Sequence, residues 1–76
     1  MGNSLLFQEE TIMVKINGKE EDAAGISVAQ YLENLGCDAG RVAVEINEEI
    51  LPKKEYAATI LKENDSVEIV RFVGGG

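Results

Sequence analysis

The sequence predicts an α+β fold in which roughly four to five strands form a mixed sheet and one main helix packs across one face. Three observations support this expectation. Apolar and polar residues alternate over residues 11–17 and 41–47, which is the period of half-buried strands. A single helix signal lies between these two segments. The run with the highest β propensity comes last, at residues 67–73.

A single domain is expected for a chain of 76 residues, and we place it at residues 13–73. Residues 1 to about 10 show no clear period, so we expect residues 1–12 to be an N-terminal extension or leader that is disordered or covers a sheet edge or a neighbouring chain. Residues 74–76 are all glycine and are expected to form a flexible C-terminal tail. The apolar residues of the leader are Leu5, Leu6 and Phe7.

The first predicted unit is a hairpin. Residues 11–17 form its first strand, and Asn17-Gly18 follows directly. This dipeptide is the strongest short hairpin signal, because both central residues of a type I′ turn need a positive φ. The returning strand is expected from Lys19 to about Ala23. The residues of the first strand that share one face are Ile12, Val14 and Ile16.

A short helix is predicted next. Ser27 and Gln30 have the spacing of a capping box, in which the two side chains satisfy backbone N–H groups at a helix start. Gly36 supplies the left-handed residue that ends the helix. A helix this short packs one face on the sheet. Its apolar residues at helical spacing are Val28, Tyr31, Leu32 and Leu35.

The segment from residue 41 to residue 47 is the next predicted strand. Asn47-Glu48 then turns the chain into Ile50-Leu51, and Pro52 limits the strand that follows. The inward-facing residues of the 41–47 strand are expected to be Val42, Val44 and Ile46, and the outward-facing ones Ala43 and Glu45.

The last part of the chain contains one weak and one strong pattern. Residues 53–61 predict a helical turn and a short edge strand, with Tyr56 and Ile60 as apolar anchors. Asn64-Asp65-Ser66 is a turn, and residues 67–73 are expected to form the central strand, beside the first strand. The order of hairpin, helix, two strands and final strand is the β-grasp architecture.

Composition excludes several classes of function. Seven Lys and Arg against 14 Asp and Glu give a net charge of −7, which repels phosphate groups, so we expect no nucleic-acid and no membrane partner. The same charge serves solubility or speeds encounter with a basic docking face. One cysteine and no histidine leave no expected metal site and no His-based catalysis. Without a bilayer-spanning run or a basic signal-peptide region, the expected location is cytoplasmic.

The terminal glycines are the candidate reactive segment. Because Gly74 and Gly75 lack Cβ atoms, they can thread through a narrow channel and bring the carboxylate of Gly76 to a buried site. An α-carboxyl with a pKa of about 3.3–3.7 is an anion at neutral pH. It therefore needs activation, such as adenylation by ATP, before a thiolate or persulfide can leave sulfur on the chain.

Each candidate residue also has an interpretation that involves no chemistry. Three terminal glycines also fit a frayed tail or a cloning remnant, but their place after the last strand of a β-grasp pattern favours chemistry. Cys37 is a reactive thiol or a bystander, and we favour the bystander because no Lys, Arg or His lies beside it in sequence. Arg71 is a salt-bridge residue or a partner contact, and the sequence leaves both open.

Several segments between Met13 and Gly76 carry a family resemblance. They are Val14–Lys19, Val28–Leu32, Val42–Asn47, Pro52–Tyr56 and Asn64–Gly76. In these segments the chain resembles the ThiS family of thiamin-biosynthesis sulfur carriers, which are prokaryotic relatives of ubiquitin. The last segment is the most specific, and residues 1–12 lie outside the resemblance.

The resemblance implies a ubiquitin-like carrier rather than an enzyme. The carboxylate of Gly76 would be adenylated and converted to a thiocarboxylate that donates sulfur to thiazole synthase. The implied partners are an E1-like adenylyltransferase, a thiazole synthase and a cysteine-desulfurase-derived persulfide donor. No bound cofactor is implied, since ATP is used by the partner enzyme.

Partner binding is expected on the last strand. If Val67 and Ile69 face the core, Val70 and Phe72 share the opposite face, and together with Val73 we expect them to bind a partner. The alternative is that the leader or a loop covers them. Two other functions also stay open: a carrier for molybdopterin or another sulfur-containing product, and a β-grasp interaction module without tail chemistry.

Overall fold

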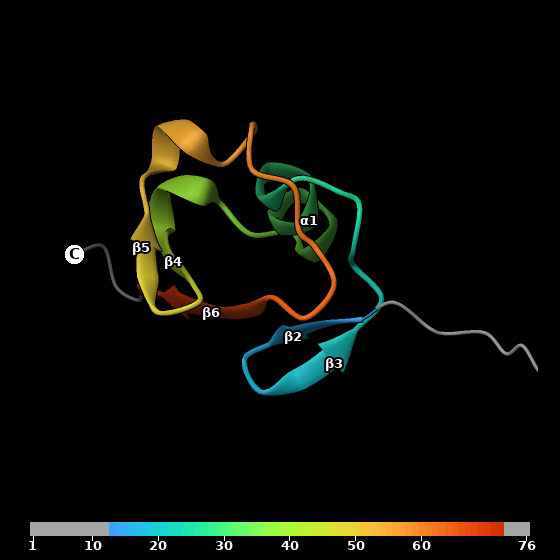
Figure 1. Ribbon diagram of the computed structural model, residues 1–76. Coiled ribbons are helices and arrows are strands. Elements are labelled where there is room, and N and C mark those ends of the chain that lie inside the picture. The colour runs from blue at the N-terminus through green and yellow to red at the C-terminus, as the bar shows by residue number, and fades with distance from the viewer. Residues whose placement is uncertain (1–12, 73–76) are drawn as a thin grey trace, which may run out of the picture.

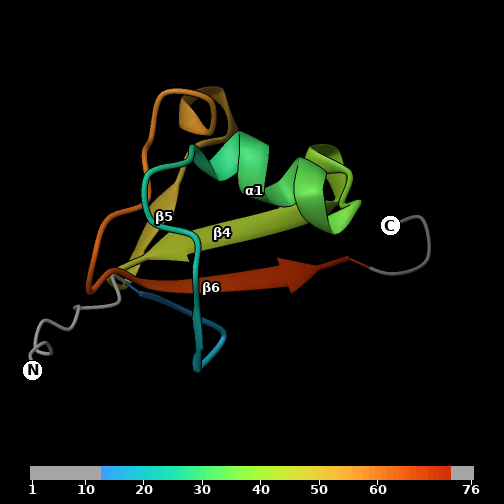
Figure 2. The same cartoon turned by 90° about the vertical axis from the view of Figure 1, so that its right-hand side faces the viewer.

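Residues 13–72 are described by a computed structural model, and within them five strands form one mixed sheet with an α-helix across one face (Figure 1, Figure 2). The strands are β2 (Val14–Ile16), β3 (Lys19–Glu21), β4 (Val42–Ile46), β5 (Glu49–Leu51) and β6 (Ser66–Arg71). The helix is α1 (Val28–Leu35), and the two 3-10 turns are η1 (Ala39–Arg41) and η2 (Lys53–Glu55). This arrangement confirms the predicted β-grasp fold.

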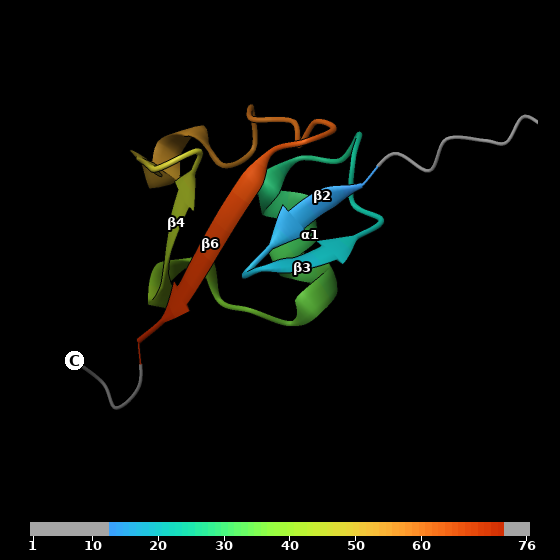
Figure 3. The same ribbon diagram turned by 60° about the horizontal axis from the view of Figure 1, so that its bottom comes forward.

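The last strand lies at the centre of the sheet, as predicted. The strand order is β3-β2-β6-β4-β5, so β6 has one hairpin on each side (Figure 3). It pairs parallel with β2 and antiparallel with β4. The described strand ends at Arg71, one residue before Phe72, and Val73 lies outside the described residues. Ile12, which we placed on the inward face of the first strand, also lies outside them.

Two tight turns set the register of the hairpins. Asn17 and Gly18 have φ of 52° and 84°, which confirms the predicted turn between β2 and β3. Asn47 and Glu48 have φ of 53° and 73° between β4 and β5, so two non-glycine residues are left-handed there. The Asn47 side chain stabilises this turn, because its Oδ1 accepts a 3.0 Å hydrogen bond from the Ser66 amide.

The returning strand β3 is shorter than predicted. It ends at Glu21, and the Ala23 amide donates a 3.0 Å hydrogen bond to the Glu21 carbonyl, which turns the chain out of the sheet. Ala23 is nevertheless buried in the core, so its apolar character reflects packing rather than strand pairing.

The helix prediction is correct in its bounds and partly wrong in its details. Ser27 Oγ accepts a 3.0 Å hydrogen bond from the Gln30 amide, and Gly36 ends the helix with a φ of 76°. The second half of the capping box is absent, because Gln30 Nε2 donates to Asn34 Oδ1 instead, at 2.9 Å. Leu35 is exposed rather than packed, since the helix ends at this residue and Cys37 packs against the core beyond it.

The segment before β6 contains the largest correction. Tyr56 is buried as expected, and burial raises the pKa of its phenol above the ordinary value of 10.0. Ile60 is 48% exposed, whereas Leu61 is 1% exposed and serves as the anchor. The reason is backbone pairing with residues 25–27, where the Gly25 amide donates to the Leu61 carbonyl at 2.8 Å. This pairing is an isolated bridge rather than the predicted edge strand.

The core lies between the helix and one face of the sheet. Both layers contribute apolar side chains to it, and all buried residues among the described ones are apolar or Tyr. They are Val14, Ile16, Ala23, Val28, Leu32, Val42, Val44, Tyr56, Leu61 and Val67. This leaves the opposite face of the sheet without a covering layer within residues 13–72 (Figure 2).

Candidate functional site

The end of β6 leads directly into the glycine tail. Gly74, Gly75 and Gly76 lie outside the described residues, as does Val73, so the description of the site stops at Phe72. In Figure 2 the red strand β6 runs along the whole sheet and ends at its far side. Phe72 is the last described residue before the tail.

Val70 and Phe72 lie on the outer face of the sheet, away from α1. They are 55% and 52% exposed, while Val67 on the opposite face is buried and Ile69 is half-buried. The strand parity predicted from sequence is therefore confirmed. Whether these side chains bind a partner stays a prediction.

Neighbouring strands extend this exposed surface. Ala43 pairs with Val70 across β4 and β6, and Glu45 pairs with Glu68. Ile50 of β5 pairs with Glu45 and is 75% exposed. We call Ala43, Ile50, Val70 and Phe72, together with Glu45 and Glu68, the outer-face patch. The sequence analysis missed Ile50, although its pairing opposite an outward Glu45 would have placed it outward.

The end of β6 is held by the side chain of Asn17 on one side and by a backbone hydrogen bond on the other. Asn17 Oδ1 accepts a 2.7 Å hydrogen bond from the Ile69 amide, and its Nδ2 donates to the Ile69 carbonyl at 3.3 Å. On the other side, the Phe72 amide donates a 2.8 Å hydrogen bond to the Arg41 carbonyl. The backbone is thus anchored on both sides within three residues of Phe72.

Among the described residues, the charged side chains near the end of β6 form one exposed ion pair. Arg41 and Asp38 approach to 3.8 Å, but both are exposed, so this ion pair contributes little to stability. Arg71 forms no ion pair with any other residue in 13–72, and a contact between Arg71 and a partner stays a prediction. Cys37 is half-buried and packs against the core, as a bystander would.

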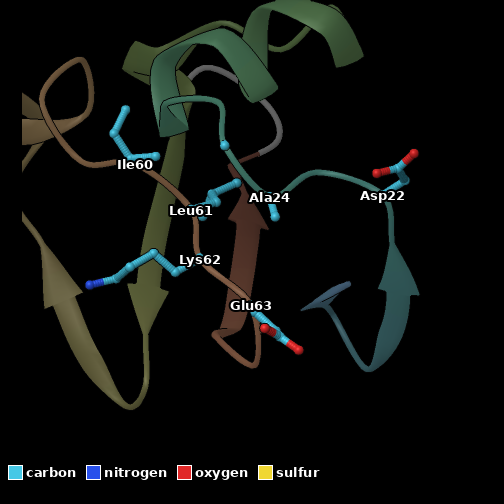
Figure 4. A pocket seen from close by; sticks show the side chains of 7 residues that line it. Asp22, Ala24, Ile60, Leu61, Lys62 and Glu63 are labelled. Atoms are coloured by element: carbon cyan, nitrogen blue, oxygen red, sulfur yellow. The ribbon is translucent and has the colours of Figure 1, made fainter. Parts of the chain in front are cut away.

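A groove among the described residues, which we call the remote groove, is lined by no residue at the end of β6 (Figure 4). It has a volume of about 560 Å³ and is lined by the loops after β3 and before β6. Ala24, Ile60 and Leu61 form its apolar part. Asp22, Lys62 and Glu63 point away from one another in Figure 4, so they do not converge on a ligand. Within residues 13–72, no group of three or more His, Cys, Asp or Glu could hold a metal ion.

None of the described helices is long and apolar enough to cross a membrane. Among residues 13–72, the candidate site consists of the end of β6 and the outer-face patch.

The order of the strands in the sheet and the single helix across one face define a β-grasp protein. The ThiS family model matches residues 4–76, and the chain belongs to the ThiS family. This finding confirms the resemblance drawn from the sequence. The match begins nine residues before Met13 and so includes part of the segment that we treated as a leader.

Individual relatives agree with the family. The chain is 35% identical over 68 residues to the sulfur carrier protein ThiS of Bacillus subtilis, covering 84% of this chain and 100% of that one. The crystal structure of the thiamine biosynthesis protein ThiS from Geobacter metallireducens superimposes with a TM-score of 0.69 at 35% identity, covering 84% of this chain and 99% of that chain.

A further relative is much longer. The chain is 47% identical over 62 residues to a thiazole synthase of Paramagnetospirillum magneticum. The match covers 80% of this chain but only 19% of that protein, so the chain spans about a fifth of the length of this relative. A ThiS-like segment and a thiazole synthase are therefore parts of one polypeptide in that organism.

Proposed function

We propose that this chain is a sulfur carrier of thiamin thiazole biosynthesis and that its reactive group is the C-terminal carboxylate of Gly76. The observation that carries the proposal is the family match, which runs through residue 76 and so includes the whole glycine tail. The anchored end of β6 supports it, because a carrier must present its tail in a reproducible direction. The protein itself acts as a co-substrate and not as an enzyme.

The chemistry follows from the carboxylate. Its oxygen attacks the α-phosphorus of ATP, pyrophosphate leaves, and an acyl-adenylate forms on Gly76. A persulfide sulfur then attacks the carbonyl carbon and AMP leaves with the bonding electron pair. A second thiol then attacks the donor sulfur of the resulting acyl disulfide and forms a disulfide with it, and the sulfur bonded to Gly76 leaves as a thiocarboxylate. The glycines before it let this group enter a narrow active site.

Three partners are proposed for these steps. An E1-like adenylyltransferase uses the ATP, a cysteine-desulfurase-derived persulfide supplies the sulfur, and a thiazole synthase accepts it. The thiazole synthase has the strongest support, because its Paramagnetospirillum magneticum representative contains a segment similar to this chain. The carrier binds no cofactor of its own, and we place it in the cytoplasm with these enzymes.

We propose the outer-face patch, with Val73, as the surface that docks on these enzymes. Val70→Ala and Phe72→Ala are expected to weaken binding to the adenylyltransferase roughly tenfold each, because both side chains lose apolar area that a partner would bury. Their free energies of unfolding should change by less than about 1 kcal/mol, since both are more than half exposed. Calorimetric titration and urea unfolding measure the two effects.

Ile60→Ala is the matched control for this surface. Ile60 is 48% exposed, but it lines the remote groove, so its truncation should leave the affinity unchanged. A large loss of stability in the Val70 or Phe72 variants with unchanged affinity would instead assign both side chains to the fold.

One assay tests the proposed function against the interaction module that the sequence left open. The chain is incubated with ATP and its adenylyltransferase, and release of pyrophosphate and formation of the acyl-adenylate are measured. A carrier forms the adenylate, and a module without tail chemistry does not. Transfer of sulfur to thiazole synthase, followed by appearance of the thiazole product, then separates the thiamin pathway from molybdopterin.

A further inference from the structure

The backbone of β6 presents an open edge just before the tail. Antiparallel pairing alternates between hydrogen-bonded and non-hydrogen-bonded residue pairs. The Phe72 amide donates to the Arg41 carbonyl, which makes Arg41 and Phe72 a bonded pair, as are Ala43 and Val70 two residues earlier. Arg71 pairs with Val42 between them, so its N–H and C=O groups point away from β4, toward the side of β2.

Nothing in β2 reaches those two groups. The parallel pairing of β2 with β6 ends at Ile16 and Val67. The Asn17 amide then donates to the Val67 carbonyl at 2.8 Å, and its side chain pairs with both backbone groups of Ile69. At Gly18 the chain turns back into β3, and Figure 3 shows β6 continuing past this turn. Arg71 thus has no backbone partner on this side among the described residues.

Within residues 13–72, no strand therefore lies beside Arg71 at the position that a longer β2 would occupy. The Asn17 side chain bonds both backbone groups of Ile69, as a neighbouring strand would. The backbone groups of β6 on this side are therefore paired up to Ile69, and the first unpaired ones among the described residues belong to Arg71. Exposed backbone donors and acceptors of a strand are a template for another extended chain. The gap is short, and it adjoins the central strand rather than β3 or β5 at the two outer edges of the sheet.

We propose that thiazole synthase adds a short extended segment to β6 at Arg71, in line with β2. The proposal rests on the proposed function and extends it to the way the tail is aligned. Gly76 is the fourth residue after Phe72, so the extended chain between them reaches roughly 13–14 Å. Backbone pairing at Arg71 would fix the direction in which β6 points toward the synthase. The outer-face patch alone would not fix this direction, because its side chains lie on the face of the sheet and not in its plane.

The chemistry of the added segment follows from its surroundings. It supplies one backbone acceptor for the Arg71 N–H and one donor for the Arg71 carbonyl. The neighbouring outer-face residues include Glu68 and Val70. A segment with a basic and an apolar side chain on that face would complement them, in agreement with the net charge of −7.

Amide hydrogen exchange tests the pairing directly. In the free carrier, the Arg71 amide should exchange fast and the Val70 amide slowly, because Val70 is bonded to Ala43. Saturating the isotope-labelled full chain with its cognate thiazole synthase should slow exchange at Arg71 at least about tenfold. Unchanged exchange at Arg71 in the complex, or failure of the synthase to bind the chain, would overturn the proposal.

A pair of variants provides a second test. Arg71→Pro removes the N–H that the fold does not use, and Val70 before it already has the extended conformation that a following proline favours. Arg71→Ala removes the side chain and keeps the N–H. We expect binding to thiazole synthase to be roughly tenfold weaker for the proline variant than for the alanine variant, with melting temperatures within about 5 °C. Equal affinities would overturn the proposal.

The proposed function and this inference fail separately. If the adenylyltransferase forms a thiocarboxylate on the chain while the Arg71 amide stays unprotected in the synthase complex, only the strand pairing is wrong. If no adenylate or thiocarboxylate forms, the carrier function itself is wrong, whatever the exchange rates are.

Discussion

Gly75→Val is expected to reduce formation of the thiocarboxylate at least roughly a hundredfold. The valine Cβ and methyl groups widen the tail where it must pass a channel shaped for glycine, and a displacement of about 1 Å at the reacting carbon has an effect of this size. Unfolding should be unaffected, because the core is built from residues 14–67. Charging by the adenylyltransferase and the melting temperature are measured on the same preparation.

Gly75→Ala is the graded control for this variant. Its single methyl group should give an intermediate rate, with the same melting temperature. If the valine variant were charged at the normal rate, the channel would not require glycine, and the role of Gly74 and Gly75 in threading would be wrong.

Leu61→Ala is expected to cost about 2–5 kcal/mol of unfolding free energy, because it removes a side chain that is 1% exposed at the centre of the core. A domain of this size has only a small total stability, so much of the protein should be unfolded at 37 °C. Ile60→Ala, one residue earlier, should cost less than about 1 kcal/mol because Ile60 is 48% exposed. Urea unfolding compares the two.

This pair of variants also tests the largest correction to the sequence analysis. Equal losses at positions 60 and 61 would mean that both side chains are buried, contrary to the pairing of this segment with residues 25–27. A larger loss at Ile60 would restore it as the anchor that the sequence predicted.

Local rules predicted most of the fold. The Asn17-Gly18 turn, the Ser27 cap and the Gly36 stop depend on residues close in sequence, and all three are confirmed. Alternation also placed Val42 and Val44 correctly in the core. The position of β6 between β2 and β4 followed from the β-grasp order of elements.

The errors occur where distant residues decide the local conformation. Leu61 is buried because its backbone pairs with residues 25–27, more than 30 residues away, as the 2.8 Å bond from the Gly25 amide shows. The pattern of apolar residues within 53–61 could not predict that pairing, because the partner residues lie outside this segment. The end of β3 is a similar case. Ala23 packs in the core and does not pair with a neighbouring strand.

The candidate site divides in the same way. Strand parity was enough to predict the exposure of Val70 and Phe72. The bridge from Asn17 to Ile69 spans 52 residues and could not be predicted from either segment alone, because Asn17 already had a sufficient role in its turn. The prediction that the tail carries sulfur came from the family resemblance and not from the composition.

The most direct test of the carrier function is the place where sulfur is bound. The full chain is charged with ATP, adenylyltransferase and a persulfide donor, and its intact mass and fragments are measured. We expect one oxygen-to-sulfur replacement located on Gly76, the same mass change in Cys37→Ser, and none after deletion of Gly76, which shortens the reach by roughly 3.3–3.6 Å. Sulfur found on Cys37, or unimpaired charging of the shortened chain, would contradict the assignment of the reactive group to Gly76.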